Sequence, residues 1–431
     1  MKNSGVEWIG EIPEDWDVSK IGQLYEERRT KVSDTVYPPL SVTMQGILPQ
    51  LATAAKSDAH DDRKLVLKGD FAINSRSDRR GSCGISSQDG SVSLINTVLH
   101  PKSEMNPIYY NWLFHSFRFS DEFYKNGHGI VDDLWTTSWS EMKRIFIPFP
   151  PKSTQQRIVS YLDKKCSKIE ETIQNQQQVI EKLKAYKQSL ITEAVTGKIK
   201  IQNGKACGKY ESYKDSRLKW LGDFKIPEVW NTIQVKSFVS IPVVDGPHES
   251  PELFDNGIPY ISATAIENSK IDFSLKRGFI SEKYCDECDK RYKPMRDDIL
   301  MIKLGATTGQ VAIIDTDERF NIWVPLAAIR CNKTIALPKF VFYSFQSDYC
   351  LKQMEMSWTF GTQQTLGVSS IERLKIFLPN VETQKTIAYF LDKKCTAIDS
   401  AIEQKQKLIE KLTEYKKSLI YECVTGKKEV N

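Results

Sequence analysis

The chain has 431 residues, of which 40% are hydrophobic, and its 60 basic and 55 acidic side chains give a net charge of +5. This length allows two or three domains, each with its own core. No apolar run is long enough to cross a bilayer and the first residues do not resemble a signal peptide, so we expect a cytoplasmic protein without a membrane partner. A charge balance this mildly basic neither requires nor excludes a nucleic-acid partner.

Residues 1–150 are expected to form a first mixed α/β domain. It opens with SGVEWIGEIPEDW at residues 4–16 and closes on the β-like run IFIPFPP at residues 145–151. Residues 108–125 have the pattern of a helix that is buried on one face. Between these edges lie two polar loops that contain glycine, SRSDRRGS and YKNGHGIVDDLW.

The two loops hold the side chains of this domain that suit DNA best. Arginine can read guanine and serine can bond to several bases, whereas lysine and arginine also hold phosphates. A charged loop that is simply solvated is the competing interpretation, and ordinary packing explains Trp135 equally well. The candidate DNA contacts of the first domain are Arg76, Ser77, Arg79, Arg80, Lys125 and His128.

A long segment occurs twice, as residues 154–198 and 383–427, without a gap and with about half of the positions identical. Each copy follows a proline and begins with a threonine, Thr154 or Thr383, that can cap a helix. In the first copy we expect a short helix through Leu162 and Asp163, then a long one from about residue 167 to 195. Such a duplication predicts two recognition surfaces presented by one repeated scaffold.

Apolar residues recur in both copies with a heptad period, which is typical of helices packed along a seam. Polar residues at Gln176, Lys187, Lys405 and Lys416 interrupt the seam, and such interruptions help to fix register at a cost in stability. A coiled coil that dimerises the chain is the simpler interpretation. Because one chain supplies both helices, we predict instead that they pair in antiparallel fashion around a pseudo-two-fold axis. The predicted scaffold residues are Ile169, Ile173, Ile180, Leu183, Leu190, Ile398, Ile402, Ile409, Leu412 and Leu419.

A helix of about 28 residues is about 42 Å long, at a rise of about 1.5 Å per residue. One turn of B-DNA spans about 34–36 Å, the usual distance between half-sites. The predicted helix is therefore long enough to hold two DNA-reading modules about one turn apart.

A polar, glycine-containing linker at residues 201–214 leads to a second mixed α/β domain at residues 215–378. Its edges repeat those of the first domain, since SRLKWLGDFKIPEVW echoes the first opening and KIFLPN closes the domain. Residues 338–354 again have the pattern of a helix buried on one face. The predicted organisation is thus domain 1–150, helical spacer 151–200, linker 201–214, domain 215–378 and helical spacer 379–431.

The second domain offers different loop residues. GATTGQ and GTQQT place glycines, which permit close backbone approach to phosphate, beside glutamines, which suit adenine. Tight turns are the competing interpretation for both loops, and the histidine of DGPH can equally stabilise a turn. The candidate DNA contacts of the second domain are His248, Lys303, Thr307, Thr308, Gln310, Gln363 and Gln364.

No catalytic signature survives inspection. The chain has no phosphate loop, no G-x-S-x-G elbow, no H-E-x-x-H and no glycine-rich cofactor loop of a methyltransferase. The nine cysteines are odd in number and scattered, which favours reduced thiols. Cys285 and Cys288 form one CxxC without a second pair at zinc-finger spacing, so two ordinary thiols explain it better than a metal site. We therefore expect a chain without catalytic residues, metal or cofactor.

The whole chain resembles the specificity subunits of type I restriction–modification systems, in which two target-recognition domains alternate with two helical regions. The resemblance rests on the W-[IL]-G…IP…W openings, on the Q-x-x-I-x-x-[FY]-L-D helix starts and on the helix ends KL-x-x-Y-K-x-SLI-x-E-x-VTGK. In the second domain DGPHESPELFDNGIPYIS, RDDILMIKLGATTGQVAII and FGTQQTLGVSSIERLKI are similar to segments of such domains. The first domain departs from them, because no DGxH stands near its start.

This resemblance implies a non-catalytic, α+β DNA-specificity subunit that reads one half-site with each domain and sets the spacer with its helices. It further implies double-stranded DNA, two modification subunits and the restriction subunits as partners. S-adenosylmethionine, ATP and magnesium would belong to those partners. Two other interpretations stay open: a protein-interaction scaffold with coiled-coil repeats, and a single-chain methyltransferase or nuclease with undetected motifs.

Overall fold

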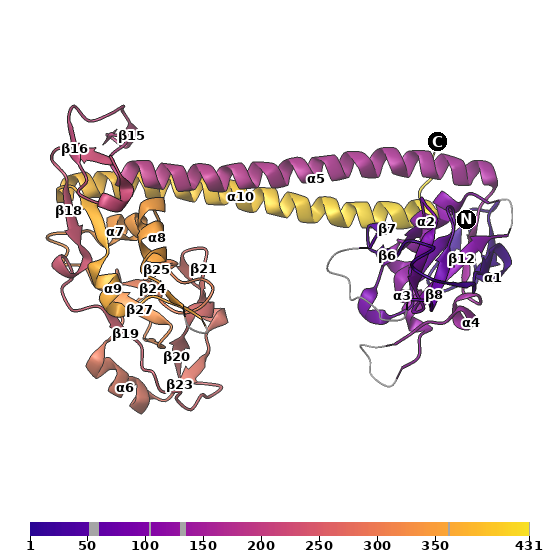
Figure 1. Ribbon diagram of the computed structural model, residues 1–431, viewed down its shortest axis with the longest axis horizontal. Coiled ribbons are helices and arrows are strands. Elements are labelled where there is room, and N and C mark those ends of the chain that lie inside the picture. The colour runs from indigo at the N-terminus through magenta and orange to yellow at the C-terminus, as the bar shows by residue number, and fades with distance from the viewer. Residues whose placement is uncertain (51–59, 103–104, 130–134, 361–362, 431) are drawn as a thin grey trace. The chain divides into compact units, whose positions relative to one another are not determined.

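The computed structural model describes residues 1–50, 60–102, 105–129, 135–360 and 363–430. Its contacts divide the chain into two compact units: unit 1 contains Met1–Gln177 and Lys405–Asn431, and unit 2 contains Gln178–Gln404. Each unit joins one mixed α/β domain to parts of both long helices (Figure 1). This division into units does not test the domain boundaries that follow from the sequence repeat, so those boundaries stay a prediction.

Unit 1 is built on a four-stranded antiparallel sheet in the order β10-β9-β12-β4. A three-stranded sheet, β11-β8-β5, and the hairpin β6–β7 accompany it. The strands are β1 (Lys2–Asn3), β2 (Glu11–Ile12), β3 (Asp17–Lys20), β4 (Tyr25–Glu27), β5 (Lys31–Val32), β6 (Leu40–Thr43), β7 (Gly46–Pro49), β8 (Arg63–Val66), β9 (Phe71–Asn74), β10 (Cys83–Ile85), β11 (Gly90–Ser93), β12 (Asn96–Pro101) and β13 (Phe146–Phe149). The short helices are α1 (Ile21–Leu24), α2 (Pro107–Phe114), α3 (Phe117–Lys125) and α4 (Trp139–Met142).

Unit 2 contains a four-stranded antiparallel sheet in the order β19-β27-β24-β25 and a three-stranded sheet in the order β23-β20-β26. Its strands are β14 (Ile201–Gln202), β15 (Lys205–Ala206), β16 (Tyr213–Asp215), β17 (Lys225–Pro227), β18 (Asn231–Gln234), β19 (Val244–Asp245), β20 (Ile258–Ile261), β21 (Ile266–Glu267), β22 (Lys270–Ile271), β23 (Gly278–Ile280), β24 (Ile299–Ile302), β25 (Val311–Ile313), β26 (Asn321–Ile322), β27 (Leu326–Ile329), β28 (Thr359–Phe360), β29 (Gln364–Thr365) and β30 (Lys375–Leu378). Its short helices are α6 (Glu282–Arg291), α7 (Pro338–Phe345), α8 (Asp348–Glu355) and α9 (Val368–Arg373).

The two units repeat the four-stranded sheet strand for strand. Strands β4, β9, β10 and β12 correspond in chain order and in sheet position to β19, β24, β25 and β27. Their central strands, FAIN and ILMI, are apolar runs because both faces of the strand are covered. The three-stranded sheets differ, since β20 pairs with β26 in parallel whereas the pairs of the unit 1 sheet are antiparallel. Most of the divergence thus lies outside the repeated sheet.

Each of the two segments predicted to be helical contains a pair of helices. In unit 1, α2 ends before Ser116, whose hydroxyl accepts the backbone N–H of Phe119 and caps α3. In unit 2, Ser347 stands between α7 and α8, but its side chain makes no cap hydrogen bond and donates to the carbonyl of Ser344 instead. The buried aromatic rings of both helices account for the apolar pattern, and those of Phe114 and Phe119 lie 4.6 Å apart between centroids. The prediction that both segments are helical and have a buried face is confirmed, and in unit 1 the cap at Ser116 divides the segment into two helices.

The two long helices are α5 (Lys152–Val195) and α10 (Val381–Val424), each of 44 residues. The expected break between a short and a long helix is absent, because neither segment contains proline or glycine and the apolar stripe continues through buried Leu162 and Leu391. The second helix also begins earlier than predicted, since Asn380 Oδ1 accepts the N–H of Thr383 at 2.9 Å. Within the described residues, no helix has an apolar stretch that could cross a membrane.

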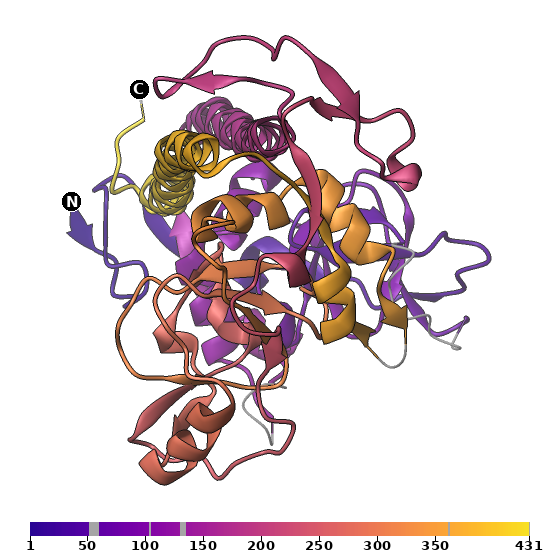
Figure 2. The ribbon, with the colours of Figure 1, turned by 90° about the vertical axis from the view of Figure 1, so that its left-hand side faces the viewer.

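The helices pack against each other in antiparallel fashion within each unit (Figures 1 and 2). In unit 1 the first half of α5 lies against the last half of α10, and Lys405 Nζ donates to Gln176 Oε1 at 2.9 Å. In unit 2 the remaining halves meet, and Lys187 pairs with Asp399 at 2.7 Å. All ten predicted scaffold residues are buried or half-buried. The predicted fold class, two mixed α/β domains with two long antiparallel helices and an internal repeat, is confirmed.

Each long helix ends in the same local structure. The VTGK glycines, Gly197 and Gly426, have φ values of 70° and 73°, a conformation that favours glycine at a helix end. A Cβ atom on Gly197 would lie 2.5 Å from Pro227 Cδ, and one on Gly426 would lie 2.7 Å from Pro13 Cγ. The end of each helix therefore packs directly on the IP…W opening of the domain in its own unit.

Candidate nucleic-acid interface

In unit 1 the structure brings the two predicted loops together. The loop after β9 runs through a 3-10 turn at Ser77–Arg79, and the N–H of Ser77 donates to the carbonyl of Trp135 at 2.8 Å. Arg76 and His128 each form a bridge with Thr136. Residues 130–134 of the second loop lie outside the described residues. Two distant parts of the sequence thus meet in unit 1 and bring together Arg76, Ser77 and His128.

Each arginine of this loop has a carboxylate partner. Arg76 and Arg79 share Asp78, at 3.0 Å and 3.7 Å, and Arg80 pairs with Asp121 at 3.2 Å. Exposed pairs of this kind are worth about 0–1 kcal/mol, so a phosphate can compete for the guanidinium groups. The side-chain oxygen of Ser77 is buried, and it has no hydrogen-bond partner among the described residues.

Lys125 lies at the end of α3 and pairs with Glu7 at 3.5 Å, with most of its side chain exposed. His128 is exposed as well, and its Nε2 lies 4.0 Å from Glu141. Both side chains are accessible to a partner. No observation here distinguishes base contact from phosphate contact for either of them, so their DNA roles stay predictions.

Unit 2 repeats this loop pairing with other residues. Leu304, just after β24, forms a bridge with Thr365, and the N–H of Leu366 donates to the carbonyl of Lys303 at 2.8 Å. The N–H of Gly305 donates to the carbonyl of Gln364 at 3.0 Å. Residues 361–362 of the predicted GTQQT loop lie outside the described residues. The loop that follows β9 in unit 1 therefore meets the segment before α4, and the loop that follows β24 in unit 2 meets the segment before α9.

The predicted residues of these loops differ in accessibility. Thr307, Gln310 and Gln363 are exposed, and Gln364 is half-buried. Thr308 is buried, and its hydroxyl donates to the carbonyl of Gly305 at 2.7 Å. The side chains of Thr307, Gln310 and Gln363 are thus accessible to a ligand, whereas the hydroxyl of Thr308 bonds to the protein backbone.

Lys303 and His248 both belong to a network centred on Asp245. Lys303 is only 8% exposed, and its Nζ lies 3.0 Å from Asp245 Oδ2. His248 Nε2 lies 3.1 Å from the same oxygen, while its ring is largely exposed. The phosphate contact predicted for Lys303 stays a prediction, and the structure gives the lysine a buried carboxylate partner.

Arg291 completes this network, with Nη2 2.5 Å from Asp245 Oδ1. Burial alone would raise the pKa of Asp245, but the hydrogen bond and charge of Lys303, helped by His248 and Arg291, hold it below its ordinary value. One ionised carboxylate therefore faces two permanent cations and a histidine. The DGPH motif contains both Asp245 and His248, but only His248 is predicted as a contact, and no pattern in the sequence indicates Arg291 as a partner of Asp245.

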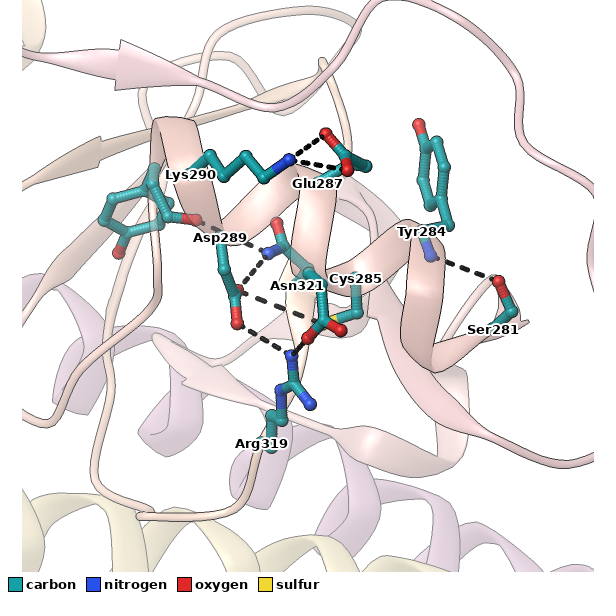
Figure 3. Close-up of polar contacts among 10 residues, drawn as sticks. Ser281, Tyr284, Cys285, Glu287, Asp289, Lys290, Arg319 and Asn321 are labelled. Carbon is teal, nitrogen blue, oxygen red and sulfur yellow. Dashed lines mark hydrogen bonds and ion pairs between the residues drawn. The ribbon is translucent and has the colours of Figure 1, made fainter.

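Arg291 is the last residue of helix α6, and polar contacts hold this helix in place. Figure 3 shows Arg319 and Asn321 converging on Asp289 of α6, at 3.0 Å in both cases. Arg319 also pairs with Asp286, one turn earlier. At the other end Ser281 caps the helix by accepting the N–H of Tyr284 at 3.2 Å. These contacts fix α6 and so fix the direction from which Arg291 reaches Asp245.

The CxxC cysteines lie on this helix and face the interior. Burial raises the pKa of the Cys285 thiol to about 11, which disfavours the thiolate that zinc requires. Its Sγ lies 3.9 Å from Asp289 Oδ1. Among the described residues, no three His, Cys, Asp or Glu side chains are grouped as a metal site requires.

A duplicated α/β domain with paired polar loops, combined with a pair of antiparallel helices, defines a modular DNA-recognition protein. The chain belongs to the family described as type I restriction modification DNA specificity domain, whose model matches residues 13–185 and 227–414. The two matches cover both domains and most of both long helices. Members of this family are specificity subunits, which recognise DNA without catalysing a reaction.

Curated relatives agree with this assignment. The MjaVIII specificity subunit of Methanocaldococcus jannaschii is 24% identical over 434 residues, covering 96% of this chain and 93% of that protein. The EcoBI specificity subunit of Escherichia coli is 22% identical over 282 residues, covering 65% and 58%.

Solved structures share the fold. A chain from a study of complex assembly and conformational transition of the type I R-M system has a TM-score of 0.70 at 14% identity and covers 97% of this chain and 100% of that one. The HsdS subunit from Thermoanaerobacter tengcongensis has a TM-score of 0.50 at 15% identity, with coverage of 97% and 98%.

Proposed function

We propose that this specificity subunit reads an asymmetric, bipartite target in double-stranded DNA, with one half-site bound by each recognition domain. The observation that carries the proposal is the repeated loop pair. Both units join the loop after a central strand, β9 or β24, to the segment before a short helix, at Ser77–Trp135 and at Lys303–Leu366. The loop pairing is thus equivalent in the two units, whereas the candidate contact residues differ: unit 1 offers arginines, and unit 2 offers glutamines and threonines.

This difference supports two dissimilar half-sites. Arginine pairs best with guanine, glutamine pairs best with adenine, and threonine hydroxyls accept several partners. Equivalent loops with the same residues would favour a palindromic target. The loops of this chain differ at nearly every position that is available to a base.

We further propose that α5 and α10 set the length of the unread spacer and dock the partner subunits. A helix of 44 residues is about 66 Å long at about 1.5 Å per residue, long enough for two half-sites on successive turns of DNA. Two modification subunits that carry S-adenosylmethionine would bind the helices and the adjoining domain surfaces. Restriction subunits would join them to form an ATP-dependent nuclease.

The test is to express the chain together with its modification subunit and to map methylated adenines across the genome by single-molecule sequencing. We expect a two-part motif with unequal halves that disappears when this chain is omitted. Exchanging residues 1–150 for the first domain of another specificity subunit should change one half only. A palindromic motif would contradict the asymmetric reading, and a change in both halves would contradict the modular one.

A further inference from the structure

Unit 1 contains a polar groove that the sequence did not indicate. It has a volume of about 790 Å³ and lies between the hairpin β6–β7 and the arginine loop that follows β9. Gln45 and Gln50 line it from the hairpin side, and Asn74 and Asn96 line it from the sheet. Amide side chains on both sides give the groove the donors and acceptors that base edges require.

The hairpin is firmly anchored to the domain. Leu40 and Ile47, one on each strand, are buried in a small core with Val66 and Val98. Two glycines allow the ribbon to approach the sheets closely: a Cβ atom on Gly84 would lie 2.8 Å from Gly46 Cα, and one on Gly90 would lie 2.6 Å from Leu40 Cγ. The hairpin is therefore a rigid projection on which a reading side chain can be placed accurately.

The tip of the hairpin presents Met44 and Gln45 to solvent, and Met44 is 72% exposed. Thr43 fixes the turn, because its hydroxyl donates to the carbonyl of Gly46 at 2.9 Å and accepts the N–H of Gln45 at 3.1 Å. The side-chain amide of Gln45 makes no hydrogen bond within the described part of the chain. Its backbone is thus held while its amide is available to a ligand.

The charge of the groove indicates an anionic partner. Among the described residues, four arginines line it, Arg63, Arg76, Arg79 and Arg80, against one carboxylate, that of Asp78. Arg63 is committed to Ser91, whose hydroxyl accepts from its Nε at 2.9 Å. The other three lie on the wall opposite the hairpin in exposed ion pairs, and Arg80 also lies 5.4 Å from the centroid of the Tyr124 ring.

We propose that the β6–β7 hairpin enters the major groove of DNA as a two-stranded ribbon, that Gln45 reads a base there, and that the arginine loop holds the adjacent phosphates. This inference rests on the proposed DNA-reading function and assigns its base contact in unit 1. The major groove, about 12 Å wide, admits a two-stranded ribbon, and glutamine bonds to adenine through N6 and N7. Phosphate contacts position such a ribbon without specifying sequence.

We expect unit 2 to read its half-site with different structural elements. Between β19 and β24, the stretch that corresponds to the hairpin region, the structure describes the strands β20 to β23 and the helix α6. The hairpin of that stretch, β21–β22, has two residues per strand against four in β6–β7, so the longer ribbon belongs to unit 1 and we expect its effect in one half of the target.

The test begins with the motif that the parent chain specifies when expressed with its modification subunit. Gln45→Ala should then make one base pair degenerate in the half-site that also changes when residues 1–150 are exchanged, and leave the other half intact. With purified complex and duplexes that carry each base pair at that position, discrimination should fall about 5-fold to 150-fold, as loss of one good base contact predicts. Gln45→Glu should favour cytosine over adenine there, since glutamate accepts a hydrogen bond from cytosine N4.

Gln88→Ala is the matched control, because Gln88 is exposed in unit 1 outside the groove. It should retain the parent motif, and all three variants should melt at the parent temperature. A Gln45→Ala variant with the same motif and the same discrimination as Gln88→Ala overturns the ribbon assignment. A parent chain that directs no methylation refutes the proposed function itself, and this result is distinct from a parent motif that Gln45 does not affect.

Discussion

Gln176 and Lys405 occupy the same position in the two sequence repeats, and they bond to each other. They are 229 residues apart, and Lys405 Nζ lies 2.9 Å from Gln176 Oε1. Contact between repeat equivalents places a local pseudo-two-fold axis at this pair. The flanking ion pairs obey the same symmetry, since Lys187–Asp399 in unit 2 is the equivalent of Lys416–Glu170 in unit 1.

Replacing this polar pair with leucine should stabilise the helices and weaken their register. In Gln176→Leu/Lys405→Leu the seam becomes apolar at this pair, while Lys187 and Lys416 stay in place, and substitutions of this kind change stability by about 0–4 kcal/mol in the favourable direction. Loss of a polar seam position also relaxes the choice of partner. We expect a higher melting temperature, together with oligomers in light scattering after size-exclusion chromatography. Lys405→Leu alone, which leaves the Gln176 amide without its partner, should be less stable than the double variant.

The glycines that end the long helices should resist substitution because of packing as well as backbone strain. Gly426→Ala should lower the free energy of unfolding by about 2–4 kcal/mol, from a left-handed backbone conformation and an overlap with Pro13. Gly5→Ala is the matched control, because its φ of 72° is nearly that of Gly426 at 73° while no atom lies within 4 Å of the added Cβ. Urea titration separates the two costs, and equal losses in both variants would show that packing on Pro13 contributes nothing.

Replacing the Asp245 carboxylate should lower the stability of unit 2. Asp245→Asn leaves the buried ammonium of Lys303 unpaired, and breaking such a pair costs about 3–5 kcal/mol. Because the folded state holds the pKa of Asp245 below its ordinary value of 3.8, the stabilisation is present above that pH and is lost as the pH falls through the folded pKa. The difference between parent and variant in chemical denaturation should thus be full at pH 7 and shrink below about pH 4. A difference independent of pH would place the cost elsewhere.

The sequence predicts this fold where its signal is repeated. The heptad positions from Ile169 to Leu190 occur twice, and their burial follows directly from that period. The loops are found by composition, since arginine and glutamine beside glycine mark candidate DNA contacts. The sequence does not predict that these loops pair with other segments. Arg76 and Thr136 form a bridge although they lie far apart in the sequence, and no local pattern links them. The sequence does not predict the groove lined by Gln45 for the same reason. The hairpin at Leu40–Pro49 has the pattern of an exposed turn, and the groove depends on segments from other parts of the chain.

An arginine that holds phosphate should affect salt dependence more than sequence preference. Arg79→Ala removes one exposed guanidinium from the groove of unit 1. On duplex DNA that carries the parent motif, the slope of log K against log salt concentration should become shallower by about 1, with affinity lost similarly on every sequence. Binding of the purified complex at several salt concentrations measures this slope. An unchanged slope with an altered motif would make Arg79 a base contact instead.

Lengthening both helices by one heptad should lengthen the spacer of the target without changing either half-site. Seven residues inserted after Gln177 and seven after Gln404 fall at the boundaries between the units and preserve the heptad pattern. The insertion adds about 10.5 Å of helix, which corresponds to about three base pairs of B-DNA. Methylation mapping should therefore recover the parent halves about three base pairs further apart. Two-residue insertions at the same points turn the apolar stripe by about 200° at about 3.6 residues per turn, and these should abolish methylation by disrupting the seam. A parent spacer in the seven-residue variant would show that the helices do not set the distance between half-sites.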